Sequence, residues 1–299
     1  MTHADSSIRR RGLVLAVGAY LWWGLLPVYM HLLRTVPPFQ FVAYRVLFSA
    51  VLLTVAVIAT GRTAATLAVL RSRRAMAALV PTALLIATNW SIYIWAVLDG
   101  HVVDASLGYF LNPLLSVVLG VVFLRERMRA LQWLAVGLAA AGAAAMAAEG
   151  GAGIVIALAL AGSFGVYGLV RKVVQVDALS GLAVETAVLA PLAALYLALV
   201  PAPAFGQDHA IDALLVLSGI VTAAPLLLFA AAARRLPLST LGLIQFLSPT
   251  LQFIEGVTIF GEAIRPVHLV TFGLIWTGLA LFAAEGLAAA RRAPAVAPR

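Results

Sequence analysis

Three charged residues lie inside long apolar stretches of the sequence: Arg45, Glu185 and Glu255. Charged residues within a membrane are costly, and they commonly mark substrate sites or proton relays, so we take all three as candidates for charge coupling. At about 1.5 Å per helical residue, Arg45 and Glu255 fall at a similar depth near one face of the bilayer, and Glu185 falls nearer the other. We expect Arg45 and Glu255 to pair or to share a cavity. The alternative for each of the three is snorkelling toward the nearby interface.

Uncharged polar residues form two stripes that could contact a solute. Each stripe has the i, i+3, i+7 spacing that places its members on one face of a helix. The stripes are 136 positions apart, and they consist of Tyr109, Asn112 and Ser116, and of Gln245, Ser248 and Gln252. Glu255 extends the second stripe. We expect both stripes to line a transport path.

A further polar pair, Asn89 and Tyr93, has i, i+4 spacing in the middle of a third apolar stretch. A polar group that lacks a partner in hydrocarbon costs free energy. We therefore expect Asn89 either to bond a neighbouring helix or to face a solute, with Tyr93 on the same face of the helix.

Prolines interrupt the apolar stretches that carry these residues. Pro113 follows Asn112, Pro249 follows Ser248, and Pro27 lies within the first apolar stretch. Because proline has no N–H, it frees a carbonyl one turn earlier and kinks a helix. We expect these three positions to act as hinges, the alternative being static kinks.

Composition places these residues in a membrane protein. Of the 299 residues, 63% are hydrophobic and only 11% are charged, and the mean hydropathy is +1.04. A soluble domain has roughly a quarter of its residues charged. The chain has no Cys, which excludes disulfides, Cys-based metal sites and thiol chemistry. The net charge of +8 could indicate a nucleic-acid partner, but its distribution along the chain indicates membrane orientation instead.

A helix needs about 20 apolar residues to cross a bilayer. Ten segments meet this requirement: 12–33, 38–60, 76–98, 104–124, 130–149, 153–171, 178–200, 211–233, 239–261 and 266–287. The connections between them are too short for a soluble domain. The first apolar run, after Arg9–Arg11, is too long for a cleavable signal peptide.

The positive charges orient the ten segments. If the N-terminus is cytoplasmic and the connections alternate, 17 of the 20 Lys and Arg residues fall on the cytoplasmic side. They are Arg9, Arg10, Arg11, Arg62, Arg71, Arg73, Arg74, Arg125, Arg127, Arg129, Arg171, Lys172, Arg234, Arg235, Arg291, Arg292 and Arg299. Arg34 and Arg265 fall outside, and Arg45 lies within a segment. Both termini are therefore expected in the cytoplasm.

The two halves of the chain repeat each other. At a shift of 136 the matching pairs are Pro113 and Pro249, Gly120 and Gly256, Glu126 and Glu262, Gly137 and Gly273, and Gly142 and Gly278. Each half holds five segments, and because five is odd the second half must enter the membrane from the opposite side, a plan typical of secondary transporters. We expect repeats at 1–150 and 151–287 and a disordered cytoplasmic tail at 288–299. The alternative is duplication of a generic helix bundle.

The sequence lacks the motifs of the common membrane enzymes and of ATP hydrolysis. HExxH, paired Asp-rich motifs and a phosphate-binding loop are all absent. We therefore expect neither an enzyme nor a bound cofactor or metal.

Several runs resemble the RarD family, which belongs to the EamA group of the drug/metabolite transporter superfamily. They are AYLWWGLLPVY at 19–29, TNWSIYIWAV at 88–97, ASLGYFLNPL at 105–114, SFGVYGLVRK at 163–172, LSTLG at 238–242 and SPTLQF at 248–253. The resemblance covers about residues 10–287. It implies a ten-helix permease of two EamA repeats in a bacterial plasma membrane. The chain departs from the family pattern at Gln40, where an acidic residue is frequent, and at Glu255, where an apolar residue is usual.

We expect a permease or exporter that moves a small amphipathic metabolite or drug by alternating access, around a midplane cavity between the fourth and ninth segments. Proton coupling through Glu185 or Glu255 is left open. The small-residue surface of 134–148 and its image near 273–278 could pack within the bundle or form a homodimer. The alternatives are a passive channel and a lipid-handling protein similar to a flippase.

Overall fold

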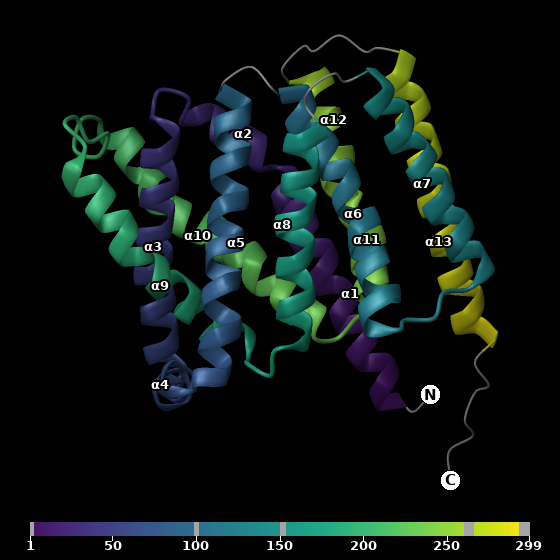
Figure 1. Ribbon diagram of the computed structural model, residues 1–299, viewed down its shortest axis with the longest axis horizontal. Helices are drawn as coiled ribbons and strands as arrows, with labels where there is room; N and C mark the ends of the chain where they lie inside the picture. The colour runs from purple at the N-terminus through teal and green to yellow at the C-terminus, as the bar shows by residue number, and fades with distance from the viewer. Residues whose placement is uncertain (1–2, 99–101, 150–153, 260–265, 293–299) are drawn as a thin grey trace.

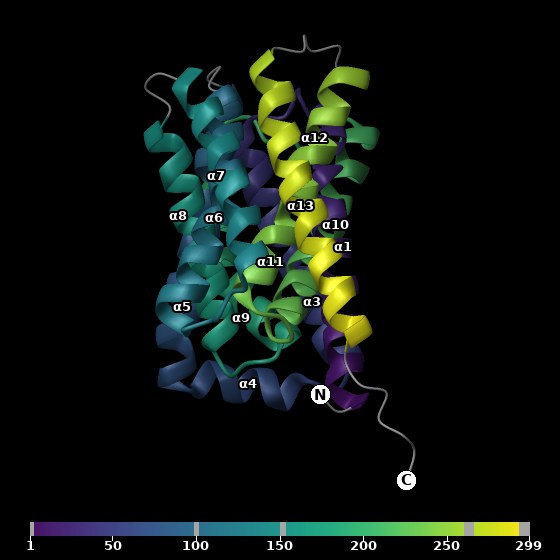
Figure 2. The same ribbon diagram turned by 90° about the vertical axis from the view of Figure 1, so that its right-hand side faces the viewer.

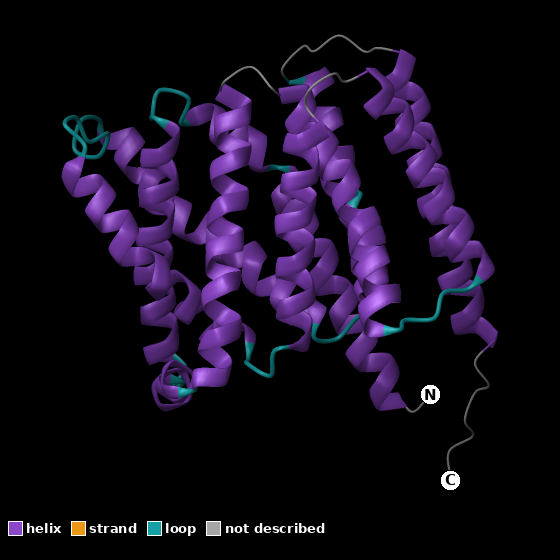
Figure 3. Cartoon of the chain, viewed as in Figure 1, coloured by secondary structure: helices purple, strands orange, loops and turns teal. Residues whose placement is uncertain are grey.

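The computed structural model describes residues 3–98, 102–149, 154–259 and 266–292. Within these ranges the chain is helical and has no strand (Figure 3). The helices are α1 (His3–Gly24), α2 (Leu26–Leu32), α3 (Pro38–Ala59), α4 (Thr63–Arg71), α5 (Arg73–Leu98), α6 (Val102–Leu124), α7 (Ala130–Glu149), α8 (Ile154–Val173), α9 (Ala178–Leu199), α10 (His209–Ala233), α11 (Leu238–Gln245), α12 (Leu247–Thr258) and α13 (Pro266–Arg292). All but α4 run roughly along one direction in a single bundle (Figures 1 and 2).

Each expected apolar segment coincides with a helix, but two are broken. The first is divided at Leu25 into α1 and α2, and the ninth is divided at Phe246 into α11 and α12. Pro27 and Pro249 follow these breaks within three residues, and a proline cannot supply the N–H that a continuous helix needs. Among the described residues, five helical stretches are long and apolar enough to cross a membrane: Ser7–Leu32, Pro38–Ala59, Arg73–Trp95, Ala178–Leu199 and His209–Ala233.

The short helix α4 was not expected from the sequence. It lies across one end of the bundle, at a large angle to the other helices (Figure 2). Its Thr66 Oγ1 donates to Ser180 Oγ at 3.1 Å, and Arg62, just before it, forms an ion pair of 2.8 Å with Asp177. The same end of the bundle holds the start of α1 and the end of α13 (Figure 1).

Asp177 and Asp208 cap the N-termini of α9 and α10. Asp177 accepts from Ser180 N, and Asp208 accepts from the N–H groups of Ala210 and Ile211. Partial burial would raise the pKa of Asp177, but the hydrogen bonds from Ser180 and the nearby Arg62 outweigh it and leave that pKa below its ordinary value. The two backbone hydrogen bonds likewise lower the pKa of Asp208.

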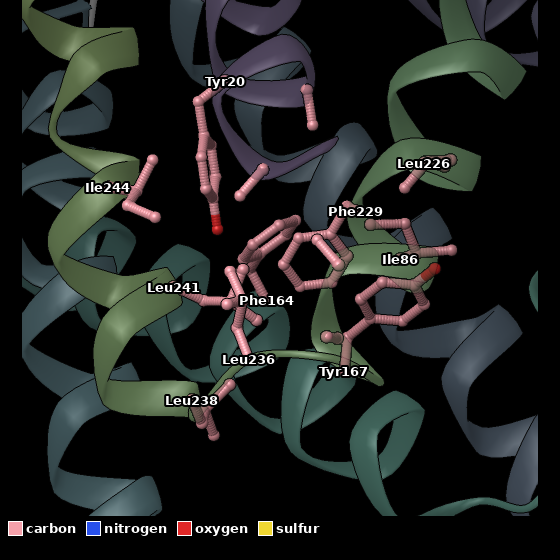
Figure 4. Close-up of a cluster of buried hydrophobic side chains, with 14 of the residues drawn as sticks. Tyr20, Ile86, Phe164, Tyr167, Leu226, Phe229, Leu236, Leu238, Leu241 and Ile244 are labelled. Atoms are coloured by element: carbon pink, nitrogen blue, oxygen red, sulfur yellow. The ribbon is translucent and has the colours of Figure 1, made fainter. Parts of the chain in front are cut away.

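A cluster of aromatic and aliphatic side chains joins the helices in the centre of the bundle. Tyr20 of α1, Phe164 and Tyr167 of α8 and Phe229 of α10 converge there with Leu241 of α11 (Figure 4). The rings of Phe164 and Phe229 have their centroids 5.4 Å apart, a normal distance for an aromatic pair. This core fixes the relative positions of helices from both halves of the chain.

Helices α7 and α13 lie side by side at one edge of the bundle (Figure 1). A Cβ added to Gly142 would lie 3.0 Å from the carbonyl oxygen of Thr271, and one added to Gly278 would lie 2.9 Å from that of Ala135. Thr271 Oγ1 also donates to the carbonyl of Gly142 at 3.0 Å. These glycines therefore serve packing between α7 and α13. Gly137 of α7 and Gly273 of α13, the other pair matched by the shift of 136, face open space, because a Cβ added to either meets no atom within 4 Å.

Several expected features lie outside the described residues. They are the linker at 150–153, Glu262 and residues 293–299 of the tail.

Candidate functional site

Arg45 lies in α3, about two turns from the start of the helix, and it is almost fully buried. Its Nε donates to Thr222 Oγ1 of α10 at 2.9 Å. Its guanidinium carbon lies 4.4 Å from the ring centroid of Trp90 and 5.6 Å from that of Phe41. A desolvated cation over an aromatic ring gains about 2 kcal/mol. Arg45 is thus held in the bundle by a hydroxyl and two aromatic faces, and it does not reach the interface by snorkelling.

Tyr93 and Tyr109 connect the surroundings of Arg45 with those of Glu255. Their rings meet edge to face, with centroids 5.1 Å apart. Tyr109 lies in the neighbourhood of Arg45, and Tyr93 lies in that of Glu255. Tyr93 of the polar pair on α5 and Tyr109 of the first stripe therefore contact each other.

Arg45 and Glu255 form no ion pair in the described part of the chain. No carboxylate of a described residue lies within 4.0 Å of the Arg45 guanidinium. Glu255 is buried, and neither of its carboxylate oxygens has a hydrogen-bond partner among the described residues. Arg45 and Glu255 therefore form no ion pair with each other, and a cavity shared by the two stays a prediction.

The first polar stripe lies where α6 and α11 approach closely. A Cβ on Gly242 of α11 would lie 2.6 Å from the carbonyl oxygen of Pro113 and 3.0 Å from Ser116 Cβ. Asn112 Oδ1 and Gln245 Oε1 are buried and have no hydrogen-bond partner in the described part of the chain. Buried polar atoms without partners are rare in native structures. These amide oxygens are therefore candidates for contact with a bound solute or with water.

The second stripe is directed mainly at α1. Ser248 Oγ donates to the carbonyl of Tyr20 at 2.6 Å, and Gln252 Nε2 donates to the carbonyl of Trp23 at 3.3 Å. Pro27 explains the second bond, because a residue with an N–H at that position would normally donate to Trp23 O. Gln252 thus compensates the missing N–H of Pro27, and Ser248 fastens α12 to α1.

Asn89 bonds a neighbouring helix, which is one of the two roles expected for it. Its Nδ2 donates to the carbonyl of Leu160 and to Ser163 Oγ, each at 3.0 Å. This amide joins α5 to α8, the counterpart of the contact between α10 and α1 in the repeat.

Glu185 is buried with a partner that the sequence did not indicate. Its Oε1 accepts from Thr82 Oγ1 at 2.6 Å and lies 3.7 Å from Nη1 of Arg171, and both charged side chains are 1% exposed. A Cβ on Gly181 would fall 2.2 Å from that Nη1, so only glycine leaves room for the arginine. Arg171 had been assigned to a cytoplasmic connection. Arg171 does lie in the last turn of α8, but its side chain is buried between α8 and α9.

Glu126 forms a second polar contact that the sequence did not indicate. Its carboxylate accepts from the N–H groups of Leu238 and Ser239 at 2.7 and 2.9 Å, and from Ser239 Oγ at 2.6 Å. It therefore caps the N-terminus of α11 from the end of α6. Arg125 has φ 54°, and this left-handed residue lets Glu126 N bond the carbonyl of Gly120 at 3.1 Å. Glu126 is one of the residues matched between the two halves of the sequence, but the sequence does not indicate that it contacts Leu238 and Ser239.

The fold and the site define the class of the protein. Large apolar side chains are exposed around the bundle, as at Leu199, which is 73% exposed, and Val155, which is 70% exposed. Charged and amide groups are buried between the same helices. Soluble monomers rarely expose such continuous apolar surface, whereas a lipid-facing surface has this character. The chain is a multi-pass helical membrane protein with charged and amide groups buried among its helices.

Comparison with known proteins gives the family. Residues 10–148 match the model of the EamA-like transporter family. An uncharacterized transporter of Vibrio cholerae is 44% identical, over 97% of this chain and 98% of its own length. The RarD protein of Escherichia coli is 41% identical, over 96% of this chain and 99% of its own length. The chain belongs to the RarD family of EamA-like transporters, and it is a membrane transporter.

Two further similarities place the chain in context. A Pseudomonas aeruginosa relative named chloramphenicol-sensitive protein RarD is 34% identical, over 92% of this chain and 94% of its own length. A crystal structure of another protein shares the fold with a TM-score of 0.74 and 21% identity, covering 91% of this chain and 97% of that one.

Proposed function

We propose that this transporter is a carrier that spans a bacterial inner membrane ten times, in two inverted repeats, and moves a small amphipathic metabolite or drug by alternating access. The repeats would be residues 1–150 and 151–287, with both termini in the cytoplasm. The solute would pass between α6 and the pair α11 and α12.

Reciprocal contacts between the halves carry this proposal. A Cβ on Gly24 would lie 2.6 Å from Leu251 Cδ1, and one on Gly165 would lie 3.0 Å from Leu115 Cδ2. Gly24 and Gly165 are equivalent at a shift of 141, and Leu115 and Leu251 at a shift of 136. The contact of Gly24 with Leu251 is therefore equivalent to the contact of Gly165 with Leu115, with the two halves exchanged. Elements related by a two-fold axis make such paired contacts.

The edge of the bundle has the same reciprocity. Gly142 contacts Thr271, and Gly278 contacts Ala135. At the shift of 136, Gly142 corresponds to Gly278 and Ala135 corresponds to Thr271, so the two contacts are equivalent. Inverted halves provide two exchangeable conformations of similar energy, which is what alternating access requires. A generic duplicated bundle would not be expected to preserve reciprocal contacts at single residues.

The interior groups suggest how a solute would be held. Asn112 and Gln245 offer amide oxygens without partners, and Tyr93 and Tyr109 offer aromatic faces and hydroxyl groups. Glu255 is our candidate for charge coupling because its buried carboxylate has no described partner, whereas Glu185 is committed to Arg171. Pro27, Pro113 and Pro249 lie at or next to helix breaks or close approaches and are our candidates for hinges.

Counterflow in proteoliposomes tests the proposal. Vesicles are preloaded with an unlabelled amino acid or chloramphenicol, and uptake of external tracer is measured. We expect saturable, trans-stimulated uptake that falls about tenfold in Asn112→Ala, which loses about one strong hydrogen bond to the solute. We expect a similar fall in Glu255→Gln, which removes the carboxylate proposed for charge coupling. Thr258→Ala, which alters an exposed side chain of the same helix as Glu255, should leave uptake unchanged.

Each other outcome has a distinct meaning. Uptake without trans-stimulation would indicate a passive channel and would contradict alternating access. No exchange of any soluble solute, with transfer of a labelled lipid between leaflets, would indicate a lipid-handling protein. If Glu255→Gln leaves both exchange and its pH dependence unchanged, Glu255 has no role in coupling.

A further inference from the structure

We propose that Arg45 binds an oxyanion of the transported solute, such as a carboxylate, so that the solute is an amphipathic molecule with a negatively charged end. This inference rests on the proposed carrier function and adds the chemical class of the substrate to it.

The charge of Arg45 is not balanced by a carboxylate among the described residues. Buried charges in proteins are normally paired, because an isolated ion loses its hydration without compensation. Arg171, the other buried arginine discussed above, follows this rule, because it lies 3.7 Å from Glu185. Arg45 is only 4% exposed, and in the described ranges it has no carboxylate partner. A bound anion would supply the charge that the surrounding helices do not.

The contacts of the Arg45 guanidinium involve its Nε atom and its flat face. Thr222 occupies Nε, and the ring of Trp90 covers one face at 4.4 Å. The two Nη atoms bond no described residue. What stays available is the edge with paired N–H donors, which matches the two oxygens of a carboxylate. The contacts with Thr222 and Trp90 would fix that edge in place before the solute arrives.

Aromatic side chains, two of them with hydroxyl groups, surround Arg45. Tyr29 and Tyr109 lie close enough to interact with it electrostatically, and Phe41 lies 5.6 Å away on its own helix. Tyr109 begins the first polar stripe, which continues to the free amide oxygen of Asn112. A solute with its anionic group at Arg45 could therefore extend its apolar part along α6, on the path of the proposed function.

The test compares matched carboxylates and amides on the purified full-length protein in detergent. The probes are acetate and acetamide, benzoate and benzamide, and phenylacetate and phenylacetamide, each at 10 mM and pH 7, with the midpoint of thermal unfolding as the readout. A ligand that binds only the folded state raises this midpoint. We expect at least one carboxylate to raise it by roughly 2 °C more than its amide, because millimolar binding gives a shift of this order.

The variants assign this preference to Arg45. Arg45→Gln should abolish it. Arg45→Lys, which keeps the charge but loses the fork, should weaken carboxylate binding about tenfold, and it preserves the test if Arg45→Gln does not fold. Arg34→Gln removes an exposed arginine from the connection just before α3 and should leave the preference intact. The inference is overturned if no carboxylate stabilises the wild type more than its amide, or if the preference persists in Arg45→Gln.

A second measurement separates this inference from the proposed function. Counterflow with the stabilising carboxylate should fall at least tenfold in Arg45→Gln. If the wild type exchanges neutral solutes and Arg45→Gln exchanges the whole panel equally well, the carrier function stands and the anion site is refuted. If the carboxylate binds through Arg45 but no solute shows trans-stimulated exchange, the carrier function fails, and with it the assignment of that anion as a transported solute.

Discussion

At the scale of single residues, the contact between Arg171 and Glu185 shows how a membrane bundle retains two buried charges. The carboxylate is shared between Arg171 and Thr82, and Gly181 leaves the space in which the guanidinium lies. Burying two ions is expensive, and their attraction offsets this cost only while both are present. The pair therefore holds α8 against α9, with Thr82 adding α5.

Removing one partner of this pair should be worse than removing both. We expect Glu185→Gln to lower stability by about 3 kcal/mol, because it leaves Arg171 buried without a counter-charge. The double variant Glu185→Gln with Arg171→Met should recover most of that loss. Thr82→Val, which removes a single hydrogen bond and keeps the pair, should cost about 1 kcal/mol. Unfolding of the purified protein in detergent measures all three, and a double variant less stable than Glu185→Gln would contradict this account.

Asp177 gives a pH-dependent prediction outside the membrane segments. Its folded pKa is lowered, so its stabilising contribution is full above the unfolded pKa, about 3.9, and is lost as the pH falls through the folded value. Asp177→Asn keeps a good N-cap and removes only the charge. We expect this variant to be less stable than the wild type at pH 7 and to approach it below about pH 4.

Melting curves from pH 7 to pH 3 measure the difference for Asp177→Asn. Arg62→Gln, which removes the cation and keeps the cap, should show the same convergence at acid pH. A difference that stays constant across this range would mean that the charge of Asp177 does not stabilise α9.

The residue scale also shows where sequence reasoning stops. Glu185 stood out because it is a charge within an apolar run, but Arg171 was assigned to a connection because it lies next to Lys172 at a segment end. Only the packing of α8 on α9, with the space at Gly181, reveals that Arg171 turns inward. The same holds for the capping of α11 by Glu126, which joins residues more than a hundred positions apart.

At the scale of elements, length and hydropathy predicted the long helices well, because a bilayer requires about 20 apolar residues in each. The breaks at Leu25 and Phe246 had a signal in Pro27 and Pro249, but a proline alone does not distinguish a kink from an interruption. Helix α4 had no comparable signal, because its nine residues are too few to cross a bilayer and lie in a connection between two longer segments.

The contact of α7 with α13 yields a prediction with a matched control. Gly142→Leu would place a large side chain against the backbone of Thr271, where a Cβ already has only 3.0 Å. We expect a loss of stability of about 1–3 kcal/mol, because overpacking must force the two helices apart. Gly137→Leu lies on the same helix in open space and should change stability by less than about 0.5 kcal/mol.

Detergent melting curves of the two glycine variants test this packing directly. Equal melting midpoints for Gly142→Leu and the wild type would show that α7 and α13 do not need this contact. A large loss in Gly137→Leu would instead indicate that another surface, such as a second copy of the chain, covers that face.

At the scale of the whole molecule, the repeat and the distribution of positive charge predicted an arrangement that could not be built from sequence alone. The matching prolines and glycines showed that two halves are related, but not which residues of one half contact the other. The structure supplies those contacts at Gly24 and Leu251 and at Gly165 and Leu115. It also brings the start of α1, the end of α13 and α4 to one end of the bundle (Figure 1).

The orientation of the two halves in the membrane can be tested at repeat-equivalent positions. Thr63 follows the second apolar segment of the first half, and Gln207 follows the second apolar segment of the second half. Inversion places them on opposite sides of the membrane, with Thr63 in the cytoplasm, whereas a parallel duplication places them on the same side. Both are exposed, and the chain contains no natural Cys, so single cysteines can be introduced without altering other positions.

A membrane-impermeant maleimide applied to intact cells should label Gln207→Cys and should label Thr63→Cys only after the membrane is permeabilised. Arg34→Cys, in the connection after the first apolar segment, should label like Gln207→Cys because inversion puts both outside. Labelling of Thr63→Cys and Gln207→Cys from the same side would refute the inverted arrangement. Since alternating access depends on inverted halves that exchange conformations, that result would also remove the structural basis of the proposed mechanism.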